Sequence, residues 1–117
     1  MDPEEAAPFW KGLEQERRSL RAQLVEHGVD PDDVNSTGFE FEGGFADSAQ
    51  TTAERDRLGL VIENLRQTLA DVERAHAKIQ AGSGYGTCER CRREIGQERL
   101  EALPWARLCI SCKQEVR

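Results

Sequence analysis

The sequence predicts a mainly α-helical protein, in which an antiparallel helical hairpin of the coiled-coil type precedes a small C-terminal module with four cysteines. Residues 3–27 and 51–81 place apolar side chains at alternating steps of three and four, as helices that pack along one face do. The stretch between them contains several glycines and shows no such period, and two C-x2-C motifs follow the second helix.

The composition sets limits on size, partners and location. The chain has 117 residues, of which 38% are hydrophobic and 32% charged, so it can bury only a small core. Its net charge of −6 counts against general affinity for nucleic acids. The first residues lack the basic and apolar regions of a signal peptide, and no apolar run reaches the ~20 residues of a membrane span. We therefore expect a cytoplasmic protein without membrane contact.

The first predicted helix covers residues 3–27 and ends before Gly28, since glycine is favoured just past a helix end. Its apolar positions are Phe9, Trp10, Leu13, Leu20 and Leu24. We expect Trp10 to pack near the second helix at the base of the hairpin. Arg17 is the polar position on this face, and it either extends to solvent or pairs with Glu73 or Asp71 of the second helix.

The second predicted helix, residues 51–81, has the clearest pattern. Its face consists of Leu58, Ile62, Leu65, Leu69, Val72, His76 and Ile79. We interpret His76 as a histidine tolerated at the edge of the core and not as a metal ligand. A sustained 3.5-residue period requires a partner helix, and residues 3–27 are the nearest. We expect a monomeric hairpin, although a coiled coil between two chains would use the same faces.

Residues 28–50 are predicted to form the tip loop of the hairpin. They include six acidic residues and no basic ones. Phe39, Phe41 and Phe45 either pack across the hairpin end, which we favour, or contact a partner. Because Gly82-Ser83-Gly84 interrupts the second helix, we place the hairpin at residues 1–81 and the cysteine module at residues 82–117.

The cysteines indicate a metal site. Cys88 and Cys91 form one C-x2-C motif, and Cys109 and Cys112 form the second after seventeen intervening residues. Each motif brings two thiolates to one ion, and two motifs complete a tetrahedron, which is typical of structural zinc. An iron–sulfur cluster or redox-active disulfides are the alternatives. Four thiolate ligands leave no open position on the metal, so the site is predicted to be structural.

The residues around the cysteines form a more specific pattern. The matching segments are Y-G-T-C-E-R-C at 85–91, E-I-G at 94–96, R-L-E-A-L-P-W-A at 99–106 and L-C-I-S-C-K at 108–113. This stretch closely resembles the zinc finger of the DksA/TraR family of bacterial transcription regulators, whose pattern runs Y-G-x-C-x-x-C, I, R-L-x-A-x-P and C-I-x-C.

The resemblance implies a function. In that family the coiled coil enters the secondary channel of RNA polymerase, and acidic residues at its tip approach the catalytic centre without reading a DNA sequence. The family tip motif D-x-x-D-x-A resembles residues 44–49, where Asp47 matches the second acid, Ala49 matches the alanine and Gly44 replaces the first acid. The chain is thus expected to be a zinc-binding regulator that acts directly on RNA polymerase through Asp47 and Ala49.

Other functions are weighed against this one. A zinc-ribbon and coiled-coil adaptor that binds another protein is the main alternative, favoured by the missing tip acid. A DNA-binding finger that uses Arg90, Arg92 and Arg93 is disfavoured by the net charge. No nucleophile–base pattern is present, so no enzymatic activity is expected. In the family, a response to guanosine tetraphosphate uses an arginine where this chain has Leu103, which leaves that response unsupported here.

Overall fold

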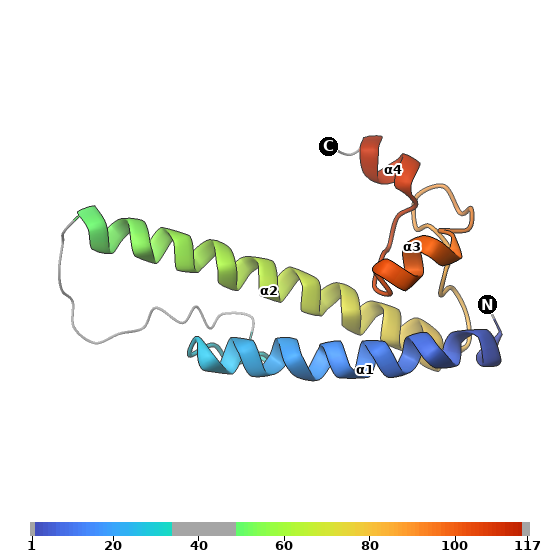
Figure 1. Cartoon of the computed structure of the whole chain (residues 1–117), viewed down its shortest axis with the longest axis horizontal. Helices are drawn as coiled ribbons and strands as arrows, with labels where there is room; N and C mark the ends of the chain where they lie inside the picture. The colour runs from blue at the N-terminus through green and yellow to red at the C-terminus, as the bar shows by residue number, and fades with distance from the viewer. Residues whose placement is uncertain (1, 34–48, 116–117) are drawn as a thin grey trace. The chain divides into compact units, whose positions relative to one another are not determined.

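The computed structural model describes residues 2–33 and 49–115, with only the helical backbone for residues 49–52. Four helices follow in the order α1 (Pro3–Glu26), α2 (Ala49–Ala81), α3 (Gln97–Ala102) and α4 (Ile110–Glu115). Figure 1 shows α1 and α2 as the long helices and the two short helices near the C-terminus. The predicted class is confirmed: the protein is mainly helical, with a helical hairpin and a four-cysteine module.

The start of α1 is fixed by its own sequence. The Oδ1 atom of Asp2 accepts a hydrogen bond from the backbone N–H of Glu5 at 2.9 Å, which satisfies a donor that the helix leaves unpaired. Pro3 occupies the first helical position, where its missing N–H removes no helical hydrogen bond. Helix α1 therefore begins where the sequence predicts, at residue 3.

The end of α1 is a Schellman turn, which extends the ordered chain beyond the predicted helix. Gly28, at φ 78°, donates its N–H to the Val25 carbonyl at 2.9 Å, and Val29 donates to the Leu24 carbonyl at 2.9 Å. Val29 is 2% exposed, which matches the apolar contact that usually accompanies this turn. Residues 28–33 were predicted as the beginning of the tip loop, and the structure shows them as a turn without helix or strand, in which Val29 is buried.

Helix α2 ends with the same hydrogen-bond pattern. Gly82, also at φ 78°, donates to the Ile79 carbonyl at 3.0 Å, and Ser83 donates to the Lys78 carbonyl at 3.2 Å. The glycine is required because a residue with a Cβ is strained at this positive φ. The predicted helix end at residue 81 is confirmed, and the segment that carries the cysteines follows this turn in the sequence.

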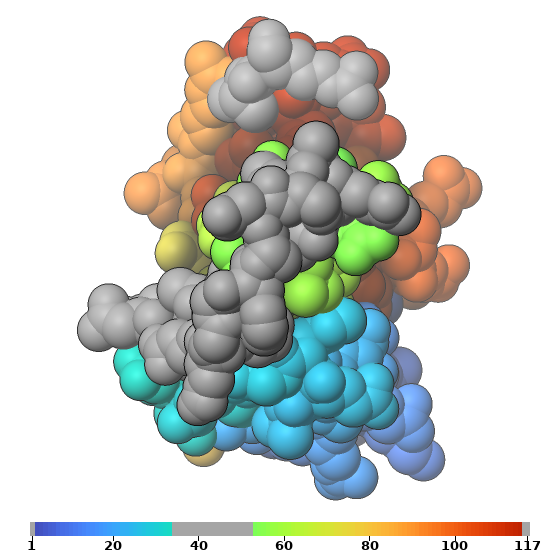
Figure 2. Space-filling model, turned by 90° about the vertical axis from the view of Figure 1, so that its left-hand side faces the viewer, coloured from blue at the N-terminus to red at the C-terminus, as the bar shows by residue number. Residues whose placement is uncertain are grey.

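Two compact units share the long helices and are described separately. The unit of residues 19–69 contains the end of α1 and most of α2. Its buried apolar side chains are Leu20, Leu24, Val29, Ile62 and Leu69. Figure 2 views the molecule from this end and shows the side chains of α1 in cyan and those of α2 in green. An ion pair of 2.8 Å between Arg21 and Asp32 holds the turn after α1 against the helix.

The second unit, Met1–Arg18 with Ala70–Arg117, contains the base of the hairpin and the cysteine module. Leu13 and Val72 are fully buried here, and the small side chains of Ala6 and Ala75 join them. The start of α1 and the end of α2 lie side by side in Figure 1. Among the described helices of both units, none is long and apolar enough to span a membrane.

Polar side chains on the predicted apolar faces make pairs between α1 and α2. Arg17 Nε lies 3.3 Å from Glu73 Oε2, which decides between the partners that the sequence left open. His76 stacks on Trp10 with ring centroids 3.7 Å apart, and its Nε2 lies 2.6 Å from Glu14 Oε1. Trp10 thus packs against the second helix as predicted, and His76 is a histidine at the edge of the core.

The pair between His76 and Glu14 predicts a measurable titration. The hydrogen bond to His76 lowers the pKa of Glu14 below its ordinary value of 4.5. Because the folded-state pKa is depressed, the stability that ionised Glu14 contributes is present above pH 4.5 and is lost as the pH falls through the lowered pKa. We expect His76→Ala to raise the pKa of Glu14 toward its ordinary value, as measured by carbon-detected NMR titration. His27→Ala removes the other histidine and should leave Glu14 unchanged, and an equal midpoint in both variants would contradict the pairing.

Candidate metal centre

The first cysteine pair lies on a tight loop within residues 85–96. The Cys88 N–H donates to the Arg93 carbonyl at 2.8 Å, and the Arg92 N–H donates to the Cys88 carbonyl at 3.0 Å. Arg92 has φ 67°, a left-handed conformation that reverses the chain after Cys91. The loop therefore turns the side chains of Cys88 and Cys91 toward the same side.

The second pair lies at the start of α4. Cys109 directly precedes this helix and Cys112 lies in its first turn, where the Lys113 N–H donates to the Cys109 carbonyl at 2.9 Å. Helix α3 links the two cysteine pairs, and its Leu100 is 1% exposed. A small apolar core around Leu100 thus supports the segment that brings the second pair back to the first.

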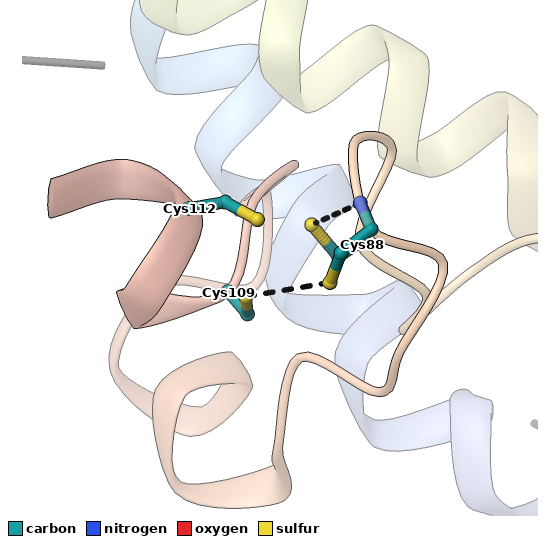
Figure 3. A group of neighbouring side chains, drawn as sticks. Cys88, Cys109 and Cys112 are labelled. Atoms are coloured by element: carbon teal, nitrogen blue, oxygen red, sulfur yellow. Dashed lines mark hydrogen bonds between the residues drawn. The ribbon is translucent and has the colours of Figure 1, made fainter. Parts of the chain in front are cut away.

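The four cysteine sulfurs form one cluster. The Sγ atoms of Cys88, Cys91, Cys109 and Cys112 all lie within 4.8 Å of one another. The Sγ atoms of Cys91 and Cys109 are 3.8 Å apart. A tetrahedral zinc ion with Zn–S bonds of ~2.3 Å separates its sulfurs by about 3.8 Å, so this donor set fits zinc. Figure 3 shows the sulfurs of Cys88, Cys109 and Cys112 directed toward a common point.

The electrostatics of the cluster call for a cation. The backbone N–H of Cys91, 3.5 Å from Cys88 Sγ, is the largest cause that lowers the pKa of the Cys88 thiol to about 6. Burial, together with the neighbouring sulfurs, raises the pKa of Cys112 to about 12. The loop is therefore arranged to hold a thiolate, but a fully ionised set of four needs a positive ion at its centre. Four clustered cysteines that fit zinc indicate a C4 zinc-finger site.

Tyr85 connects the finger to the base of the hairpin. Its side chain is 5% exposed, and its hydroxyl donates to the Pro104 carbonyl at 2.8 Å. The ring of Phe9 on α1 lies 5.8 Å from the Tyr85 ring, centroid to centroid. Burial raises the pKa of Tyr85 far above its ordinary value of 10.0, so the hydroxyl remains a donor. The tyrosine of the Y-G motif is thus a structural anchor between α1 and the finger.

The charged residues beside the ligands differ in their contacts. Arg90, between the first two cysteines, pairs with Glu115, whose Oε2 lies 2.9 Å from Arg90 Nη1. Glu89, between the first two cysteines, was missed by sequence reasoning and is contacted by several cations. Partial burial alone would raise the pKa of Glu89, but a hydrogen bond from Lys78 and nearby positive charges lower it overall. An acid between two cysteines is too common a pattern to have predicted these contacts.

The predicted polymerase-facing residues, Asp47 and Ala49, belong to the predicted tip loop of residues 28–50. Asp47 lies outside the described residues, as do Gly44 and the three phenylalanines of the predicted tip loop. Ala49 is the first residue of α2, and only its backbone is described. The proposed role of both residues therefore stays a prediction.

Comparisons with known proteins relate the finger and the hairpin to one family. Residues 83–116 match the family of the prokaryotic dksA/traR C4-type zinc finger. The RNA polymerase-binding transcription factor DksA of Escherichia coli (strain K12) is 32% identical over 117 residues, which are 97% of this chain and 72% of that protein. The chain belongs to the DksA/TraR family. The similarity to DksA spans nearly the whole chain, so it includes the residues of the hairpin as well as those of the finger.

Two further proteins are similar to this chain over most of its length. An uncharacterized protein of Aquifex aeolicus (strain VF5) is 33% identical over 101 residues, and the match spans 86% of this chain but 61% of that protein. The structure of transcription factor DksA2 from Pseudomonas aeruginosa matches with a TM-score of 0.66 and 26% identity, over 92% of this chain and 78% of that chain. The fold of this chain is therefore similar to that of a solved transcription factor over most of both chains.

Proposed function

We propose that this protein regulates transcription by binding RNA polymerase directly, and that its helical hairpin enters the secondary channel of the enzyme. The observation that carries the proposal is the similarity to an RNA polymerase-binding transcription factor over 97% of the chain. A match confined to the finger would support only a shared zinc module. The match over nearly the whole chain also includes the hairpin, through which this protein would reach RNA polymerase.

We propose residues 82–117 as the zinc-finger domain, with Cys88, Cys91, Cys109 and Cys112 as the four ligands of one structural Zn²⁺. The cysteine sulfurs lie within 4.8 Å of one another, which supports this assignment. Four thiolates and Zn²⁺ carry a net charge of −2, and a bound zinc supplies folding energy to the small module around it. In this proposal the ion has no catalytic role and fixes the finger at the base of the hairpin.

Residues 1–81 form the hairpin domain of the proposal, and its tip presents Asp47 and Ala49 to the polymerase. The N-cap at Asp2 and the Schellman turns at Gly28 and Gly82 stabilise the described helix ends. A stiff hairpin loses little conformational entropy when it enters a channel, which favours binding. The net charge of −6 would assist approach to a basic channel through long-range attraction.

A competition assay tests the proposal. Purified zinc-loaded protein is mixed with core RNA polymerase, and a competitor known to occupy the secondary channel is then added. Binding that the competitor abolishes supports the proposal. Binding that persists would place the contact elsewhere on the polymerase. No binding at micromolar concentration would overturn the proposal and favour an adaptor that uses its coiled coil to bind another protein.

Asp47→Ala is expected to separate binding from regulation. The substitution removes a carboxylate from the proposed tip without changing a described contact, so polymerase binding should persist while most of the effect on transcript yield is lost. In vitro transcription with a range of promoters measures this effect. Glu63→Ala, which removes an exposed carboxylate from the middle of α2, is the matched control and should act like the natural protein. An unchanged transcription effect in Asp47→Ala would remove Asp47 from the mechanism.

A further inference from the structure

Five charged side chains join the end of α2 to the finger, and we name them the charged latch. Lys78 Nζ lies 2.8 Å from Glu89 Oε2, and Arg74 Nη1 lies 3.1 Å from Glu89 Oε1. Arg107 Nε approaches the same Glu89 oxygen at 3.6 Å, while its Nη1 lies 3.3 Å from Asp71 Oδ1. Asp71, Arg74 and Lys78 come from α2, whereas Glu89 and Arg107 come from the finger.

The two finger residues of the charged latch lie on the loops that carry the cysteines. Glu89 directly follows Cys88, and Arg107 precedes Cys109 by two residues. The backbone N–H of Glu89 donates to the Arg107 carbonyl at 2.9 Å. This hydrogen bond joins the two cysteine-bearing loops to each other. The positions of both charged side chains therefore depend on whether the two loops are held together.

The charged latch differs from a single exposed ion pair, because it consists of several pairs whose carboxylates are partly buried. The side chains of Glu89 and Asp71 are 25% and 26% exposed, so their carboxylates are partly withdrawn from water. Isolated surface pairs contribute little, but shared acceptors in a partly buried network interact cooperatively. The complete network requires all five side chains to be positioned together. If the cysteine loops separate, Glu89 and Arg107 no longer face α2 as a unit.

We propose that the charged latch couples zinc retention by the finger to the docking of the finger on α2. A bound ion would hold the two loops so that Glu89 and Arg107 meet α2, and contact with α2 would in turn raise the affinity of the finger for the ion and so slow its loss. The two effects must be equal in free energy, because thermodynamic coupling between two binding events is reciprocal. The inference rests on the proposed zinc centre and adds a coupling that the four ligands alone do not imply.

A charge-neutral double variant separates this coupling from simple electrostatics. Losing Arg74 or Lys78 alone would remove positive charge near the −2 centre and weaken zinc binding without any latch. Asp71→Asn combined with Arg74→Gln removes one charge of each sign, so the net charge near the centre is unchanged. Arg17→Gln with Glu73→Gln is the matched control, because it breaks a 3.3 Å pair that α2 makes with α1 instead of the finger.

The first measurement is the rate of zinc transfer from the intact protein to a chromogenic chelator in excess. We expect the latch variant to release zinc about three to ten times faster than the natural protein, and the control within about twofold of it. Equal rates for all three proteins would overturn the latch but leave the zinc centre standing. A natural protein that holds no zinc would instead overturn the zinc centre and the coupling together.

The second measurement is amide hydrogen exchange of residues 70–81 with zinc bound and after its removal. In the natural protein, removal should accelerate exchange in this part of α2 as well as in the finger. In the latch variant, exchange in residues 70–81 should already be fast with zinc bound and should change little on removal. Exchange in residues 70–81 that does not respond to zinc in the natural protein would overturn the coupling.

Discussion

Cys88→Ser is expected to abolish stoichiometric zinc binding and to disorder residues 85–115, while α2 keeps much of its helical content. The Cys88 side chain is fully buried, and its sulfur receives a hydrogen bond from the Cys91 backbone. A serine hydroxyl cannot supply the thiolate that zinc requires. Zinc contributes about 10–16 kcal/mol to the folding of small zinc-finger peptides, so a finger without it has no other interaction of comparable size.

Elemental analysis of the purified variant and amide NMR spectra check this result. Ser111→Ala is the matched control, since it changes a residue between two ligands without touching the sulfur cluster, and it should keep its zinc and its dispersed spectrum. A Cys88→Ser protein that still held one tightly bound zinc per chain would show that the ligand assignment is wrong.

The sequence predicted the cysteine cluster well because zinc-binding motifs are local. Two C-x2-C motifs each place a pair of sulfurs together through a short turn, and only one long-range approach is then needed. The structure brings all four sulfurs within 4.8 Å of one another. Glu89 illustrates the opposite case. Its partners Arg74, Lys78 and Arg107 are distant in sequence, and no local rule selects them from the other charged residues.

The sequence predicted the large apolar residues of the hairpin core but missed the small ones. The three-and-four spacing identified Leu13, Leu20 and Leu24 on α1, and all three are buried. It did not identify Ala6 and Ala75, which are 4% and 5% exposed, because the pattern counts large apolar side chains. Small residues are buried where the two helices come close to each other. The distance between the helices depends on how the pair packs, so it cannot be read from the sequence of one helix.

The sequence showed that Arg17 and His76 are polar residues on otherwise apolar helix faces. It did not determine which residue each of them contacts. For Arg17 the sequence offered two acids on α2, and the structure selects Glu73 at 3.3 Å. For His76 the partner is Glu14, on the opposite helix. A shift of α1 along α2 by one helical turn, or a rotation of one helix about its axis, would give both Arg17 and His76 different partners. Side-chain pairing across a hairpin therefore depends on the register of the helices, which the apolar spacing fixes only to within about one turn.

Leu13→Ala is expected to cause the largest loss of stability in the hairpin base, about 2–5 kcal/mol in the free energy of unfolding. The Leu13 side chain is fully buried in the unit that also contains the finger. The substitution removes its apolar contacts and leaves a cavity, and alanine adds no helix penalty because it is the best helix former. Since small proteins are stable by only about 5–15 kcal/mol in total, the loss should be plain in urea denaturation followed by circular dichroism.

Leu60→Ala is the matched control for Leu13→Ala. Leu60 is the same residue type on a long helix of the hairpin, but its side chain is 72% exposed. Its truncation should change the unfolding free energy by less than about 0.5 kcal/mol, because surface substitutions of this kind remove few contacts. Equal destabilisation by Leu13→Ala and Leu60→Ala would mean that the exposed face of α2 is covered in solution, and thus that the hairpin packs against more than its own two helices. A much larger loss of unfolding free energy in Leu13→Ala than in Leu60→Ala would mean that the packing of α1 on α2 within one chain stabilises the hairpin base, to which the zinc finger is joined.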